Sequence, residues 1–152
     1  MSRSDRGVST ALGYTLTLAI TAVLISGLFV TAGSVVDTQR ERATAEELTV
    51  HGERLAADLM TVDRLSRSGQ AVELERDLPT VVGGGSYSIG VAGEPDEDGE
   101  ATQRIELRSD RLDGPVSVRF TTERDVAVEP GPIAGGTVVI GFDGGAIEVR
   151  NG

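Results

Sequence analysis

The chain has 152 residues, with 24 acidic and 14 basic side chains and a formal net charge of −10. This charge argues against nucleic acid as a partner, because phosphate binding requires a basic surface. Cysteine is absent, which excludes disulfides, thiolate metal sites and thiol nucleophiles. The single histidine excludes a histidine cluster within one chain.

The most distinctive stretch is an uncharged segment of 29 residues, Val8–Val36. As an α-helix it would extend about 44 Å, more than the roughly 30 Å of a bilayer's hydrocarbon core. The flank before it carries Arg3 and Arg6 against Asp5. Because basic residues are retained on the cytoplasmic side, we expect the N-terminus inside the cell and the residues after Asp37 outside.

Three processing outcomes suit such a segment. A cleaved signal peptide would end at the small residues Val30-Thr31-Ala32, although its apolar region is normally only about 7–15 residues long. A signal anchor would keep the whole segment uncleaved. A cut before the segment would leave the apolar helix at the new N-terminus.

A short charged stretch ends in a basic and a small residue directly before the apolar segment. The region from Asp5 to Gly13, with Thr10 where Pro is frequent, resembles archaeal type IV pilin-like proteins, especially those of haloarchaea. The resemblance implies that residues 1–7 are a leader that a prepilin-type peptidase removes. It also implies a helix packed on one face of an antiparallel sheet. The implied processing site consists of Arg6, Gly7 and Val8.

The composition of the remaining chain is typical of a halophilic protein. All basic residues are arginine, and from Asp37 onward there are 23 acidic residues and 12 arginines. High negative charge keeps a surface hydrated, and salt screens the resulting self-repulsion, because the Debye length is about 3 Å at 1 M. An ordinary acidic domain is the alternative.

One face of the apolar segment carries small side chains at helical spacing. Small residues let helices approach closely in a membrane, where lipid tails supply no hydrophobic drive between helices. We therefore predict a face that packs against copies of this helix or other pilin-like subunits, although a segment rich in Thr, Ala and Gly also produces such a stripe by chance. The predicted helix-packing face consists of Ala11, Thr15, Ala19, Ala22 and Ser26.

The helical pattern continues outside the membrane over residues 37–68, which contain no proline. Charged residues, Asp58 and Asp63 among them, are expected on the solvent-facing sides. Arg67-Ser68-Gly69 has the basic last turn and the C-terminal glycine of a helix end, so we predict one helix from near Thr10 to Arg67, with 8–36 as its transmembrane or assembly half. A narrow apolar stripe on which a domain can dock consists of Leu48, Leu55, Leu59 and Val62.

Residues 69–152 show the alternating pattern of short strands separated by turn residues. Tyr87, Ile89 and Val91 are expected to face inward. We predict six to eight antiparallel strands in a meander or small sandwich. The fold class is therefore α+β, with the long helix packed on an antiparallel β domain. The extended runs are 71–75, 80–82, 86–91, 103–108, 116–121, 126–128, 137–142 and 146–150.

Three features invite a chemical interpretation. The acidic run 94–100 alternates carboxylates as a calcium loop would, and a solvated hairpin tip explains it equally well. The Gly-rich run 82–86 lacks the lysine and the following helix of a phosphate loop, so we interpret it as a turn. His51 is expected to be a surface or packing residue. We predict no catalytic residue, cofactor or metal, and a protein that is not an enzyme.

These observations predict a structural protein of the cell membrane, crossing it once, with its β domain outside. Its expected role is that of a major or minor pilin-like subunit of a surface filament for adhesion or secretion. The expected partners are the membrane, a prepilin-type peptidase and other pilin-like subunits. The alternative is an extracellular binding module held by an uncleaved signal anchor.

Overall fold

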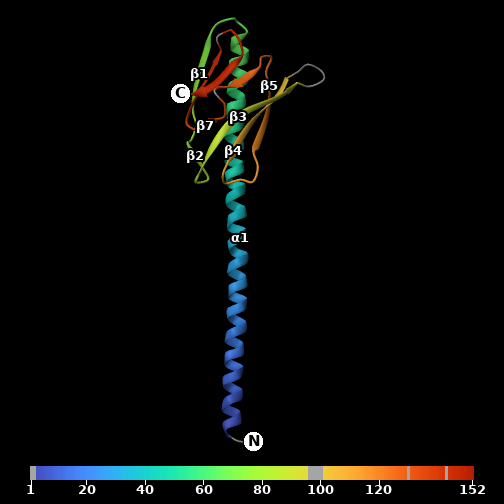
Figure 1. Ribbon diagram of the computed structural model, residues 1–152, viewed down its shortest axis with the longest axis vertical. Coiled ribbons are helices and arrows are strands. Elements are labelled where there is room, and N and C mark those ends of the chain that lie inside the picture. The colour runs from blue at the N-terminus through green and yellow to red at the C-terminus, as the bar shows by residue number, and fades with distance from the viewer. Residues whose placement is uncertain (1–2, 96–100, 130, 143) are drawn as a thin grey trace. The chain divides into compact units, whose positions relative to one another are not determined.

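The computed structural model of the protein describes residues 3–95, 101–129, 131–142 and 144–152. The chain divides into two compact units, Met1–Arg40 and Glu41–Gly152. Within the described residues there are one helix and nine strands (Figure 1). The helix supplies all of the described first unit, and its last turns belong to the second unit together with the strands.

Helix α1 spans Arg3–Ser66. The predicted start near Thr10 was too late, because residues 3–9 contain no proline and Asp5 falls in the first turn, where the helix dipole favours negative charge. The predicted end is confirmed to within one residue. Gly69 has a φ of 76° and its N–H donates to the Ser66 carbonyl oxygen at 3.0 Å. A glycine in this left-handed conformation ends the helix without steric cost.

The strands form two sheets in the second unit. One sheet has the order β1-β8-β9-β6, and the other has the order β2-β3-β4-β5 with β7 paired to β3. All eight predicted runs are strands. Their bounds are β1 Val72–Asp77, β2 Val81–Val82, β3 Gly85–Pro95, β4 Ala101–Ser109, β5 Val116–Thr121, β6 Val126–Val128, β7 Ile133–Ala134, β8 Thr137–Phe142 and β9 Ile147–Asn151.

Two details differ from the predicted antiparallel arrangement. Strand β7 was missed because its two residues lie directly between Pro132 and Gly135, which are typical turn residues. Strand β6 pairs with β9 in parallel, with Val126 opposite Ile147. Strands β7 and β8 lie between them in sequence, so the connection is long enough for the crossover that a parallel pair requires.

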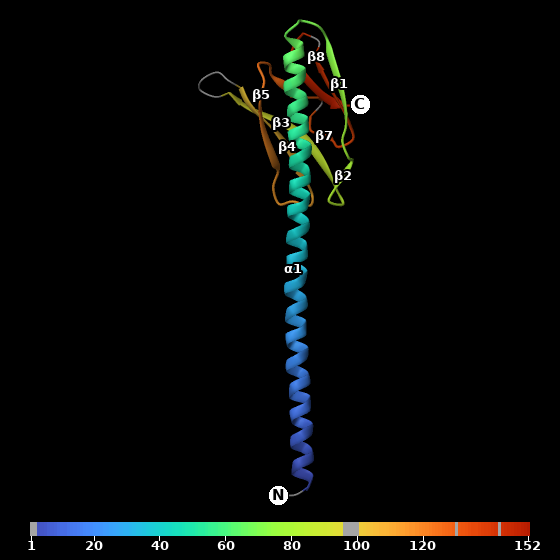
Figure 2. The ribbon, with the colours of Figure 1, turned by 180° about the vertical axis from the view of Figure 1, so that it is seen from behind.

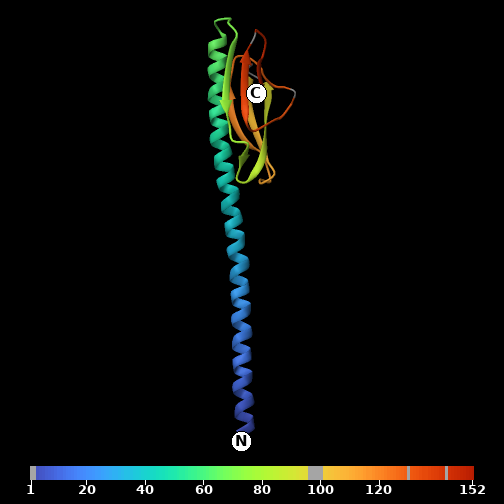
Figure 3. The same cartoon turned by 90° about the vertical axis from the view of Figure 1, so that its left-hand side faces the viewer.

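One hydrophobic core lies between the C-terminal part of α1 and the two sheets. Figure 3 shows this part of the helix running along one side of the strands. Tyr87 and Ile89 are buried and Val91 is half-buried, which confirms their inward orientation. The predicted docking stripe is also confirmed, and its members are completely buried: Leu48, Leu55, Leu59 and Val62.

Gly52 brings the helix close to the second sheet. A Cβ atom at this position would lie 2.8 Å from Val118 Cγ2 and 2.9 Å from Leu107 Cδ1. Such distances are shorter than van der Waals contact, so only glycine allows this approach of α1 to β4 and β5.

Two charged residues of α1 that were predicted to face solvent are instead buried. Asp58 accepts two hydrogen bonds from Arg76 of β1, from Nε at 2.6 Å and from Nη2 at 2.7 Å. Hydrogen bonding to this carboxylate, together with its charge, raises the pKa of Arg76 above its ordinary value. The pair joins helix to sheet, which no pattern within the helix could reveal.

Asp63 is the second buried acid, and its charge is balanced near the helix end. Arg124 Nη1 lies 3.6 Å from Asp63 Oδ1, and Arg67 Nη2 lies 3.4 Å from Oδ2. Arg124 also donates to the carbonyl oxygens of Asp63 and Ser66 at 3.5 Å. Its guanidinium lies over the Phe142 ring, 4.7 Å from the centroid. Arg124 therefore caps the C-terminus of α1, where the helix dipole favours a cation.

Candidate functional site

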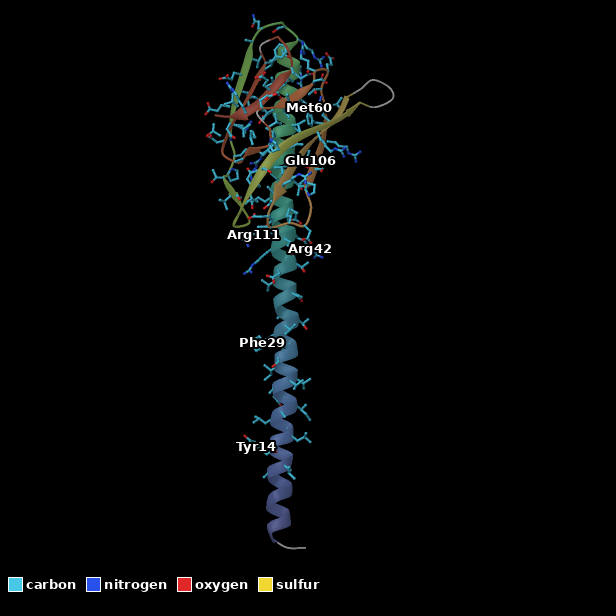
Figure 4. The ribbon with its side chains drawn as sticks, in the orientation of Figure 1. Tyr14, Phe29, Arg42, Met60, Glu106 and Arg111 are labelled. Carbon is cyan, nitrogen blue, oxygen red and sulfur yellow. The ribbon has the colours of Figure 1, made fainter. Side chains whose placement is uncertain are left out.

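The candidate site is the apolar part of α1. Every residue from 11 to 40 is exposed, including large apolar side chains such as Leu12 at 65% and Phe29 at 74%. Tyr14 and Phe29 project outward from the helix in Figure 4. Residues 11–36 carry no charge. Exposed apolar surface of this extent marks a site of contact with a membrane or another protein.

This helix is long and apolar enough to cross a membrane, and its apolar window lies near the N-terminus. No part of that window is buried within the chain. A signal sequence has the same two properties. The finding is consistent with membrane anchoring in both proposed processing routes that keep the segment.

The serine and threonine hydroxyl groups of residues 11–36 all donate hydrogen bonds within the helix. Each serine or threonine from 11 to 36 donates to a backbone carbonyl three or four residues earlier, as in the 2.8 Å bonds from Thr15 to Ala11 and from Ser26 to Ala22. Such bonds remove the cost of placing a hydroxyl in hydrocarbon. The remaining donors in this group are Thr17, Thr21, Thr31 and Ser34.

The predicted helix-packing face is uncovered. At about 100° per residue, its five members fall within roughly 80° of one another around the helix. Phe29 lies seven residues after Ala22, close to the same line, and ends the run of small side chains. All five members are exposed, namely Ala11, Thr15, Ala19, Ala22 and Ser26.

The predicted processing site lies in the first turns of α1. Arg6, Gly7 and Val8 are all helical. Their side chains are outside the part of the chain whose burial and contacts the structure describes. The cut therefore stays a prediction from the resemblance of the leader.

The structure places the other candidates in structural roles. Gly83 and Gly84 have φ of 60° and 77° between β2 and β3, which confirms the turn. A Cβ at Gly83 would collide with the side chain of Thr44 on α1. His51 is buried, with Nε2 at 3.9 Å from Glu47 Oε1, which confirms a packing role.

The sequence did not indicate the hydrogen bonds that Gln103 and the Tyr87 hydroxyl form between strands and turns of the domain. Gln103 on β4 is buried and donates from Nε2 to Thr122 Oγ1 at 3.0 Å. Tyr87 donates its hydroxyl to the Pro79 carbonyl oxygen at 2.8 Å. Burial, with a smaller contribution from Glu47, raises the pKa of Tyr87 above its ordinary value.

The acidic run proposed for calcium lies largely at 96–100, outside the described residues. Among the residues that are described, no group of three or more His, Cys, Asp or Glu side chains is arranged to hold a metal ion.

No curated protein and no solved structure matches the chain. A family model matches residues 3–150, which include the apolar helix and the β domain together. The chain belongs to this family, which is described as a family of unknown function, DUF7266.

Proposed function

We propose that the protein is a pilin-like subunit of a cell-surface filament. The observation that carries the proposal is an uncharged, fully exposed helical segment, residues 11–36, continuous with the helix on which a folded acidic β domain is packed. A soluble domain would not leave such a segment uncovered, because its apolar surface would remain in water.

The proposed pathway has two stages. A prepilin-type peptidase removes residues 1–7, and the apolar helix holds the protein in the membrane with its β domain outside. The helix then moves from lipid into the core of a filament, where it packs on other pilin-like helices. Both environments are apolar, so this transfer has little net hydrophobic cost. Close packing of the small residues against neighbouring helices then favours the filament over the lipid.

The internally bonded hydroxyls support both stages. They leave no unsatisfied donor toward lipid, and they also require no partner in a helix bundle. The acidic β domain supports an extracellular destination in concentrated salt, where screening reduces its self-repulsion.

The test compares two substitutions that each introduce phenylalanine into the apolar helix of the full-length protein, Ala19→Phe and Leu24→Phe. The two positions lie about 140° apart around the helix, so only the first fills the small-residue face. Both variants remain apolar and should enter the membrane. We expect Ala19→Phe to abolish or shorten filaments imaged by electron microscopy, while Leu24→Phe leaves them at normal length.

Normal filaments from Ala19→Phe would overturn the packing face. Absence of filaments from the unmodified protein, together with a retained Met1, would favour the uncleaved membrane-anchored binding module instead. Circular dichroism and membrane fractionation of both variants check that folding and insertion are unchanged.

A further inference from the structure

The outward surface of β4 and β5, within the second sheet, carries more arginines than carboxylates. On β4 the alternation places Ile105 and Leu107 in the core, so the residues between and beside them face outward. We call this outward surface of β4 and β5 the arginine face. It carries three arginines against one glutamate, namely Arg104, Arg108, Arg119 and Glu106.

The outward face of the other sheet is acidic. On β1 the burial alternates, with Val72, Leu74 and Arg76 half-buried and the residues between them exposed. Strand β9 alternates in the same way. We call the outward surface of β1, β8 and β9 the acidic face. Its four carboxylates and one arginine belong to Glu73, Glu75, Asp77, Glu148 and Arg150.

A notch lies in the middle of the acidic face. Gly141 of β8 is paired with Glu73 on one side and Glu148 on the other. A Cβ at Gly141 would meet nothing within 4 Å, so the space between the two carboxylates is open. Arg150 reaches Glu73 at 2.8 Å along one rim. The notch is lined by these residues together with Ala71, Val72 and Phe142.

The ion pairs within the domain leave charged side chains of both signs unpaired. Glu75, Glu148 and Arg119 form no ion pair within the part of the chain that the structure describes. Arg119 is moreover directly opposite Arg104 across β4 and β5. Arg119 is therefore the cation of this face that an acidic partner can pair.

The strand beside the arginines leaves room for a partner. Over residues 88–92 the outward positions of β3 are Ser88, Gly90 and Ala92, whose side chains are small or absent. A shallow trough over this strand is bordered by Glu106 and Arg108 on one side and by Pro132 on the other. Figures 1 and 2 show β1 and β5 on opposite flanks of the domain, so the acidic and arginine faces are separate surfaces.

We propose that the arginine face of one copy binds the acidic face of a second copy of this chain, with an arginine entering the notch over Gly141. The matching chemistry is present on the domain itself, and guanidinium groups form two parallel hydrogen bonds to a carboxylate. Because the two faces are different surfaces, the contact is heterologous and propagates from copy to copy instead of closing as a dimer.

This inference rests on the proposed function, in that it gives the β domains a second contact within the filament. It concerns only the domain surfaces, whereas the packing face concerns only the apolar helix. The two can therefore be tested separately in the same full-length protein.

The test uses single cysteines, which are unique because the natural chain has none. Ser117→Cys lies on the arginine face beside Arg119, and Gly141→Cys lies in the notch. Gly114→Cys is the control, since a Cβ there also meets nothing within 4 Å and the residue belongs to neither face. The full-length proteins, with tags of different mass, are mixed in detergent micelles and treated with a bismaleimide.

We expect cross-links between Ser117→Cys and Gly141→Cys chains at ten-fold or more above the pairs that contain Gly114→Cys. A chain with both cysteines should give a ladder of multimers. Arg119→Glu should lower the yield at least five-fold, and Glu148→Arg in the partner should recover much of it. Equal self-cross-linking of Ser117→Cys, or a mixed yield no higher than that of the control, would overturn the proposal.

Two further arms separate the remaining outcomes. In an Ala19→Phe background the mixed cross-link should persist although helix packing is lost. If the protein without this substitution formed filaments but gave no mixed cross-link, the domain contact would be refuted and the filament role would stand. Dextran sulfate is the probe for an anionic polymer. If it bound the arginine face without any cross-link between copies, that face would belong to a polyanion and the proposal would fail.

Discussion

Shortening Leu59 to alanine tests whether α1 completes the core of the β domain. Leu59 is completely buried in the middle of the docking stripe. The substitution removes three carbon atoms, which at about 0.8 kcal/mol per buried methylene amounts to roughly 2.4 kcal/mol. A residual cavity of about 40 Å³ would add about 1 kcal/mol at roughly 24 cal/mol per Å³. We therefore expect a loss of about 3 kcal/mol in the free energy of unfolding.

The assay follows urea unfolding of the full-length protein in detergent by tyrosine fluorescence. The chain has two tyrosines and no tryptophan, so a Tyr14→Phe background leaves Tyr87 as the single reporter. Tyr87 is buried in the domain and responds to loss of its core, whereas unfolding of the apolar helix would not be seen. A domain of ordinary stability, about 5–15 kcal/mol, would lose a large fraction of it.

Met60→Ala is the matched control. Met60 is the next residue of the same helix but is 37% exposed, so we expect a loss below about 1 kcal/mol. Similar losses for Leu59→Ala and Met60→Ala, or less than about 1 kcal/mol for Leu59→Ala, would refute the packing of the helix on the sheets.

Three further substitutions can be measured by urea unfolding of the domain, two of them with the same fluorescence readout. Gly52→Ala should destabilise the domain by about 1–3 kcal/mol in spite of the better helix propensity of alanine, because its Cβ collides with the facing sheet, whereas Gly33→Ala, in open space, should leave the domain unchanged. Asp58→Asn should cost about 1–3 kcal/mol, since it weakens two short hydrogen bonds to the half-exposed Arg76, and an unchanged midpoint would show that the pair contributes nothing. Folding raises the pKa of Tyr87 and so favours its neutral form. The stability that neutral Tyr87 contributes is fully present below about pH 10 and is lost as the pH rises through the raised pKa. Tyr87→Phe, followed by near-ultraviolet circular dichroism in place of fluorescence, should therefore cost about 1 kcal/mol at pH 7 and reduce the loss of stability above pH 10, while an unaltered alkaline profile would contradict this role.

The α+β class and most elements could be predicted because each depends on a local pattern. The docking stripe recurs at helical spacing, and the alternation of Tyr87, Ile89 and Val91 indicates a strand with one buried side. The Gly69 stop follows from its conformational freedom. Such signals are contained within a few residues of sequence.

The features that escaped prediction depend on partners far away in sequence. Asp58 is indistinguishable from a surface acid until Arg76 is placed opposite it, 18 residues later. Asp63 and Arg124 are 61 residues apart. The parallel pairing of β6 with β9 likewise depends on how the chain crosses between the sheets, which alternation alone does not specify.

The candidate site was predictable for a different reason. The exposed apolar segment of α1 is recognised by its length and lack of charge, both of which are properties of the sequence itself. The satisfied hydroxyls of Thr15 and Ser26 required the helix geometry. The opposed charged faces required the register of the sheets, because only the pairing of Gly141 with Glu73 and Glu148 places the carboxylates around a notch.

Mass spectrometry of the N-terminal peptide from membrane-associated protein is the most direct test of the proposed role. A mature chain that begins at Val8 and keeps the whole apolar helix is the expected result. Secreted protein that begins near Gly33, with the helix removed, would contradict both the filament subunit and the membrane anchor.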